Sequence, residues 1–325
     1  PVLFLGITIN DAVSVALVWI LVAIHYRGMR GGIGFNDLIT LFKVCGIVAI
    51  ILTAFAFGTG DTQNILRVTP VYTELSTMGL LSALGTSLIF VSFCYSGWNA
   101  AAYVAAEMNE PQRQLPRALL IGTASVVVLY LGLNAVYFYA AGAEALAGHA
   151  EVGLIASRAL FGPVGVTAVT LVLCVSIFAS ASAMTIAGPR VYYAFGKDFP
   201  PVAGLTHVNP ATGAPTFALL LQGVVTSIII ISGRIYAIQQ YAGFTLSLFA
   251  ALAVSCVIVL RVKAPDMPRP FRTWGYPFTP ILFLAISIWT MIWAVIGNPL
   301  QSTLGFATVA AGGILFYAWR NRPNH

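Results

Sequence analysis

FCYSGWN, residues 93–99, interrupts an otherwise apolar run that extends from about Met78 to Ala106. A helix that crosses a membrane satisfies its own backbone hydrogen bonds, because lipid offers no partners. A cluster of serine, glycine and asparagine at mid-membrane depth is therefore a poor choice for a plain anchor. It is typical of a helix that breaks, lines a cavity and offers backbone groups to a ligand. The stretch predicts a membrane transporter.

The composition indicates an all-α integral membrane protein. Of the 325 residues, 59% are hydrophobic and 8% are charged, with a mean hydropathy of +0.89, whereas about 25% of the residues in a soluble domain are charged. Because a span needs roughly 20 apolar residues, we predict one membrane domain over residues 1–325. Its nine spans are expected at about 11–26, 38–57, 79–106, 116–141, 164–187, 215–232, 241–260, 278–297 and 301–319.

Three further expectations concern the ends of these spans. The third span is long enough to be interrupted, and the fifth is expected to extend past the bilayer toward Phe195. Asn10-Asp11 predicts the helix cap of the first span, so the apolar residues before it are left outside.

The net charge of +6 does not indicate a nucleic-acid partner, because its placement follows the membrane. Thirteen Lys and Arg residues fall near alternate loops, and three fall on the other side, Arg67, Arg158 and Arg234. This positive-inside pattern predicts a plasma (inner) membrane protein with a cytoplasmic C-terminus, so nine spans place Pro1 outside. No signal peptide precedes the first span. We therefore expect that an odd number of earlier helices is missing and that the chain is a fragment.

No set of residues indicates an enzyme, a metal site or a cofactor. The four histidines lie at span ends or in loops, away from any pattern of a serine or cysteine nucleophile. The cysteines fall within spans and show no metal-ligand spacing; they are Cys45, Cys94, Cys174 and Cys256.

Three motifs resemble the amino acid permeases of the amino acid–polyamine–organocation (APC) superfamily. Residues 95–119, YSGWNAAAYVAAEMNEPQRQLPRAL, resemble the sixth family helix and the loop after it. Residues 180–200, SASAMTIAGPRVYYAFGKDFP, resemble the eighth helix, and residues 260–280, LRVKAPDMPRPFRTWGYPFTP, the loop between the tenth and eleventh. The resemblance covers essentially the whole chain. It implies family helices four to ten at about 11–260 and two C-terminal helices at about 278–319, with the first three helices absent.

The resemblance implies part of a five-plus-five inverted-repeat fold, in which the first and sixth helices unwind at mid-membrane and cradle the substrate. Half-helix N-termini favour a carboxylate, and freed carbonyls accept hydrogen bonds from an ammonium. Phe93 would close over the substrate, residues 94–97 would form the unwound backbone, and residues 98–99 would begin the second half-helix. The alternative is that Ser96 and Gly97 only permit close helix packing. The expected substrate-binding residues are Phe93, Cys94, Tyr95, Ser96, Gly97, Trp98 and Asn99.

Lys43 is the candidate for ion coupling. The sequence TLFKV around it resembles the fifth helix of APC members in which a lysine amine replaces a sodium ion beside the eighth helix. A lysine side chain that is shielded from water loses its proton more readily, because burial disfavours the charged form, and it is therefore suited to proton coupling. The alternative is a lysine that extends to the membrane interface. Candidate polar neighbours on the eighth helix are Ser180, Ser182 and Thr185, whose hydroxyls alternatively bond to their own helix.

We therefore predict a secondary active amino acid transporter that works by alternating access, either proton-coupled or as an exchanger. The lack of acidic residues at mid-membrane depth favours neutral substrates, because a cationic substrate needs an opposite charge. The alternative is a truncated, non-transporting membrane remnant that assembles with another subunit. The expected partners are the amino acid, the bilayer and, if coupled, protons. The sequence does not indicate an oligomer or an accessory subunit.

Overall fold

Most of the residues that the computed structural model describes lie in helices. The structure describes residues 2–4, 7–27, 29–67, 75–103, 105, 108–149, 151–232 and 235–320. The described chain divides into two units by its internal contacts. The first unit combines Pro1–Thr73 with Ala100–Ile231, and the second combines Glu74–Asn99 with Ser232–His325.

The first unit begins with a short antiparallel pair of strands, β1 (Val2–Phe4) and β2 (Ile7–Thr8). Helix α1 (Ile9–Tyr26) follows directly, and Thr8 is its N-cap. The Thr8 hydroxyl accepts a hydrogen bond from the Asp11 amide, while the Asp11 carboxylate accepts one from the Thr8 amide at 2.8 Å. This capping box satisfies two helix-end donors. The cap predicted at Asn10-Asp11 is therefore wrong in position, since Asp11 lies in the first turn and closes the box.

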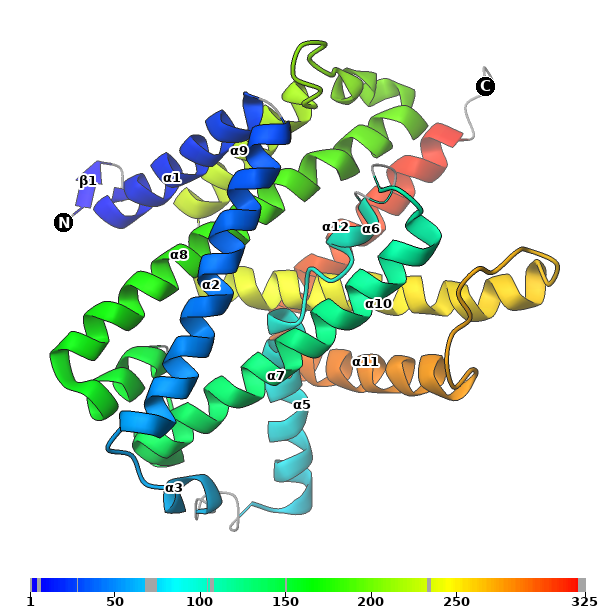
Figure 1. Cartoon of the computed structure of the whole chain (residues 1–325). Helices are drawn as coiled ribbons and strands as arrows, with labels where there is room; N and C mark the ends of the chain where they lie inside the picture. Colours follow the sequence, from blue (N-terminus) through cyan, green and yellow to red (C-terminus); the bar gives the residue numbers. More distant parts are fainter. Residues whose placement is uncertain are drawn as a thin grey trace. The chain divides into compact units, whose positions relative to one another are not determined.

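The first unit is built around α2 and α8, which lie side by side (Figure 1). Ring contacts and close approaches show that they run antiparallel, because Phe35 of α2 meets Phe178 of α8 while Gly58, just after α2, meets Leu160. The helices of this unit after α1 are α2 (Met29–Phe57), α3 (Gln63–Leu66), α6 (Ala100–Tyr103), α7 (Pro111–Leu146), α8 (Val152–Asp198), the 3₁₀ helix η2 (Pro200–Thr206) and α9 (Thr216–Ser232).

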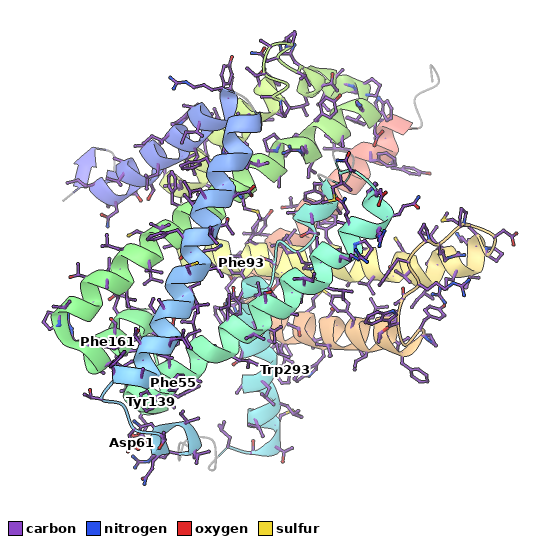
Figure 2. All side chains as sticks on the ribbon, viewed as in Figure 1. Phe55, Asp61, Phe93, Tyr139, Phe161 and Trp293 are labelled. Carbon is purple, nitrogen blue, oxygen red and sulfur yellow. The ribbon has the colours of Figure 1, made fainter. Side chains whose placement is uncertain are left out.

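A small apolar core joins α2, α7 and α8. Ala54, Val136 and Leu160 are buried together. Phe55 and Tyr139 lie beside this core with their ring centroids 5.3 Å apart (Figure 2). The Tyr139 hydroxyl donates a hydrogen bond to the carbonyl of Gly58 at 3.2 Å. One end of the unit is therefore fixed by apolar packing together with a satisfied tyrosine hydroxyl.

The second unit contains α5 (Thr77–Cys94), α10 (Ile235–Lys263), α11 (Phe278–Gly297) and α12 (Pro299–Arg320). Ile89, Phe244 and Ala294 form its buried core, one from each of α5, α10 and α11. Gly85 allows α5 to approach α11 closely, because a Cβ atom there would lie 2.2 Å from Trp293 Cδ1 (Figure 2). Small residues permit such close packing of membrane helices.

The nine predicted spans are present in the described chain as apolar helices. Eight helices are long and apolar enough to cross a membrane, and α9 is a shorter apolar helix of 17 residues. Many large apolar side chains on these helices face outward, such as Ile177 and Leu315, as expected for surfaces in contact with lipid. The predicted helical extension to Phe195 is present, since α8 ends at Asp198. The all-α, multi-pass membrane class is confirmed, whereas the single domain stays a prediction.

Candidate functional site

The third predicted span is interrupted at the predicted place. Helix α5 ends at Cys94, residues 95–99 form a turn, and α6 begins at Ala100. Gly97 has a φ of 93°, in the region that disfavours residues with a Cβ atom. The Ser96 amide donates a hydrogen bond to the Phe93 carbonyl at 3.0 Å. The second helix starts one or two residues later than expected, because Trp98 and Asn99 belong to the turn.

The break also coincides with the boundary between the two units, which falls between Asn99 and Ala100. On the side of the second unit, Phe93 is half-buried and lies near Gly243 of α10 (Figure 2). A Cβ atom at Gly243 would be 3.9 Å from the Cβ atom of Phe93. Cys94, Ser96 and Trp98 are exposed, and Tyr95, Gly97 and Asn99 are half-buried. The seven candidate residues therefore form one continuous segment of partly accessible side chains, and their role in binding substrate stays a prediction.

Lys43 lies on α2 next to the middle of α8. Gly46, one turn later, approaches α8 so closely that a Cβ atom there would be 3.0 Å from Val172 Cγ1. Phe35, two turns earlier, contacts Phe178, with a centroid distance of 6.1 Å. Lys43 falls between these contacts, so α2 at this position runs beside residues 172–178 of α8. The Lys43 side chain is half-buried.

The three hydroxyl residues proposed as neighbours of Lys43 lie further along α8, beyond Phe178. Ser180 is exposed, and Thr185 donates a hydrogen bond to the Ala181 carbonyl at 2.8 Å. Within the described ranges, no hydrogen bond links any of them to Lys43. Sequence reasoning missed Ser176, which lies in the segment beside Lys43 and donates to the Val172 carbonyl at 2.6 Å. The coupling roles of Lys43, Ser180, Ser182 and Thr185 stay predictions.

Sequence reasoning also missed a buried polar pair. His25, in the last turn of α1, is 6% exposed, and Ser182 of α8 is 0% exposed. The His25 Nε2 atom and the Ser182 Oγ atom are 3.0 Å apart, within hydrogen-bond distance. The only signal in the sequence was a histidine within an apolar run, and its position near the end of a span concealed it. The Ser182 hydroxyl therefore contacts α1, through His25, rather than Lys43 of α2.

Sites for metals are not indicated by the described residues. No group of three or more His, Cys, Asp and Glu side chains among them is arranged to hold a metal ion. The four cysteines form no disulfide within the described chain.

The family model described as "Amino acid permease" matches residues 4–316. The chain is 27% identical to the serine/threonine exchanger SteT of Bacillus subtilis over 320 residues, which cover 98% of this chain and 71% of that protein. It is 27% identical to the human large neutral amino acids transporter small subunit 2, over 71% of this chain and 43% of that protein. It is 28% identical to the human cystine/glutamate transporter, over 75% of this chain and 48% of that protein.

These similarities test the predicted class directly. The family match spans nearly all of the chain, and the relatives are named as transporters or exchangers of amino acids. The predicted resemblance to amino acid permeases is confirmed, and so is the prediction of a transporter rather than an enzyme. The matched segments cover less than half the length of two of these relatives.

Proposed function

Because this chain belongs to the amino acid permease family, we propose that the protein is a secondary active transporter that moves an amino acid across the membrane by alternating access. The observation that carries the proposal is the break at residues 95–99, where α5 ends and a glycine with positive φ redirects the chain. A broken helix at membrane depth is the usual place for a substrate in transporters of this kind. The fold alone would not specify the site.

We place the ammonium group of the substrate at the C-terminal end of α5. The carbonyl end of a helix carries partial negative charge, which favours a cation. Phe93, in the last turn of α5, supplies an apolar ring beside this end. The substrate-binding segment is residues 93–99.

We propose that Lys43 couples transport to protons. It is half-buried on α2, and α2 packs against α8 on both sides of this position. Ser176 joins the candidate neighbours because it lies in the adjoining part of α8. Ser180 remains a candidate, whereas the hydroxyls of Ser182 and Thr185 already make the contacts described above. If Lys43 does not couple protons, the protein works as an exchanger, as the name of SteT indicates for that relative.

The substrates are proposed to be neutral amino acids. The printed names of two relatives, a serine/threonine exchanger and a large neutral amino acids transporter, support this class. The cystine/glutamate transporter is named for other substrates, so relatives of similar identity to this chain differ in what they carry. The positive-inside distribution of Lys and Arg supports a cytoplasmic C-terminus in the plasma (inner) membrane.

The relatives do not favour the alternative of a non-transporting remnant, since they are named as transporters. The word "subunit" in the name of one relative supports a search for an accessory partner of this protein. Co-purification from its native membrane would test for one.

The proposed function is tested with the full-length protein in proteoliposomes. Vesicles loaded with unlabelled serine should take up labelled serine faster than vesicles without internal substrate, or accumulate it under a pH gradient. Labelled arginine should be transported poorly by comparison. Absence of amino acid uptake or exchange by a correctly folded protein would overturn the proposal.

A matched pair of variants assigns the activity to the break. Ser96→Val, within the turn, should reduce uptake, because it replaces an exposed hydroxyl with a branched apolar side chain. Thr170→Val makes a similar replacement on α8, at an exposed hydroxyl whose hydrogen bond goes to the Val166 carbonyl of its own helix. It should leave uptake close to that of the unmodified protein. Equal uptake by both variants would remove residues 93–99 from the substrate site.

A further inference from the structure

The buried contact between His25 and Ser182 joins two helices inside the first unit. Ionisable side chains within a membrane are costly, and they occur where they have a partner and a function. His25 has such a partner in the Ser182 hydroxyl, 3.0 Å from its Nε2 atom. Helix α8 is continuous at this contact, and α1 ends one residue after His25, at Tyr26. The polarity of His25 is therefore satisfied across helices and not by water at a break.

The chemistry of this pair suits a group that gains and loses a proton. A hydroxyl both donates and accepts hydrogen bonds, whereas the Nε2 atom of an imidazolium only donates. In the neutral tautomer that carries its proton on Nδ1, the Ser182 hydroxyl donates to the Nε2 atom of His25. When the imidazole takes one proton from water and becomes imidazolium, Nε2–H donates to the Ser182 oxygen instead. The hydrogen bond is present with neutral and with protonated His25, because the Ser182 hydroxyl can rotate.

A small cavity lies beside His25 and would let a water molecule exchange a proton with its side chain. Its volume is about 30 Å³, which is enough for one water molecule. His25, Thr185 and Arg190 are its polar lining residues, and the others are apolar: Ile186, Pro189, Ala214, Pro215 and Leu219. A water molecule in this cavity would have polar partners from α1 and α8.

Arg190 is the charged side chain that shares the cavity with His25. Its Nη1 atom donates to the Ile186 carbonyl of its own helix. The lining residues Ala214 and Pro215, just before α9, and Leu219 of α9 bring no titratable group. From α2, which also packs against α1, the charged side chains with described placement are the exposed Asp37 and the half-buried Lys43. Arg190 therefore opposes a second positive charge at His25, because like charges repel in a region with little water.

Other hydrogen bonds hold the three helices together around the pair. The Trp19 indole donates to the Ser227 hydroxyl at 3.2 Å, which joins α1 to α9. The Gln222 amide donates to the Met184 carbonyl at 3.2 Å, which joins α9 to α8. The junction of α1, α8 and α9 is therefore able to change its charge at His25 without losing all of its polar contacts.

We propose that His25 is a proton-binding site, separate from Lys43, that sets the pH dependence of transport. The inference rests on the proposed transport function. The imidazolium form repels Arg190 across the shared cavity and hinders the movement of α8 against α1 and α9. Transport is consequently slower when His25 carries its proton, and it recovers when the proton returns to water.

The first test measures exchange of labelled serine by the full-length protein in proteoliposomes, with equal pH on both sides so that no gradient drives uptake. Between pH 7.5 and 5.5 the maximal exchange rate should fall several-fold. His25→Gln, which keeps a hydrogen-bonding side chain but cannot titrate, should abolish this fall. The matched control is His149→Gln, at an exposed histidine outside the cavity, and it should keep the fall. A His25→Gln protein with the same fall in rate would overturn the proposal.

A second measurement does not depend on transport. In protein labelled with ¹⁵N-histidine, the His25 signal is the one that disappears in His25→Gln. It should change from the neutral to the charged form as the pH is lowered from about 8 to about 5. A signal that stays neutral over this range would overturn the proton site even if the protein transports serine. A protein that shows this titration but no serine exchange would instead refute the proposed transport function, and with it the role of His25 in transport.

Discussion

The turn at residues 95–99 and the His25–Ser182 pair are two different arrangements of polar groups in the apolar helices. At the turn, the helix itself stops, and Gly97 takes a φ of 93°. At the pair, α8 continues while α1 ends one residue later, and two side chains satisfy each other at 3.0 Å. The first arrangement leaves partly accessible polar groups, whereas the second encloses them. We infer that the break is suited to a ligand that enters and leaves, and the pair to something as small as a proton.

Lys43 represents a third arrangement. It is a half-buried polar residue on a continuous helix, and no hydrogen bond from its side chain is present within the described part of the chain. Such a group is more costly than a paired one, because a buried charge without a partner keeps its full desolvation penalty. The three regions therefore differ in how their polar groups are satisfied, and each can be altered separately.

The largest effect is expected from Lys43→Ala. If Lys43 couples protons, this variant should lose accumulation driven by a pH gradient while it retains exchange. The measurement is the uptake of labelled serine into proteoliposomes with and without the gradient. Lys197→Ala is the control, because Lys197 is exposed and lies over the Tyr193 ring. An unchanged response of Lys43→Ala to the gradient would contradict the coupling role.

The next largest effect is expected from Gly97→Ala, which tests the break. A residue with a Cβ atom at positive φ costs about 1–3 kcal/mol, and that strain should displace the turn and lower the transport rate about tenfold. Gly122→Ala is the matched control, because Gly122 lies within α7 and a Cβ atom there meets nothing within 4 Å. Alanine in a helix interior is favourable by about 1 kcal/mol. Similar rates for the two variants would show that the geometry at Gly97 does not matter for transport.

Phe93→Ala should have a smaller and more specific effect. Without the aromatic ring, the apparent KM for serine should rise several-fold, while maximal exchange changes less. Phe306→Ala on α12 removes a similar ring that is 62% exposed, and it should leave the KM unchanged. If Phe93→Ala lowers only the maximal rate, Phe93 does not close over the substrate.

The sequence predicted the break well because its cause is local. Ser96 and Gly97 are polar or flexible residues in an apolar run, a pattern typical of a broken membrane helix. The spans could also be predicted from the sequence, since each needs only about 20 apolar residues. The cap of α1 was misplaced by a few residues because Thr8 and Asp11 share the capping box, and only the structure shows which residue occupies the cap.

The His25–Ser182 pair could not be predicted from the sequence. The two residues are 157 positions apart, and the packing that joins them depends on the register of α8 against α1. The same register separates Ser182 from Lys43. A pattern of serine and threonine on one helix does not reveal which neighbouring helix each hydroxyl faces. Contacts between distant helices therefore need the structure, whereas interruptions within one helix do not.

Ser182→Ala should have the smallest effect and measures what the pair contributes to stability. The variant leaves the buried Nε2 atom of His25 without its partner, at a cost of about 1–3 kcal/mol. The midpoint of thermal unfolding in detergent should therefore fall by a few degrees. Ser255→Ala is the control, because the Ser255 hydroxyl bonds only to the Leu252 carbonyl of its own helix, and such bonds do not stabilise a helix.

The double variant His25→Gln with Ser182→Ala sharpens this measurement. If the two side chains stabilise the protein through their contact, the loss in the double variant should be smaller than the sum of the two single losses. Strictly additive losses would mean that the residues act independently despite their 3.0 Å separation. The pair would then differ less from the turn at residues 95–99, because His25 would be a polar residue that the helices tolerate without a specific partner.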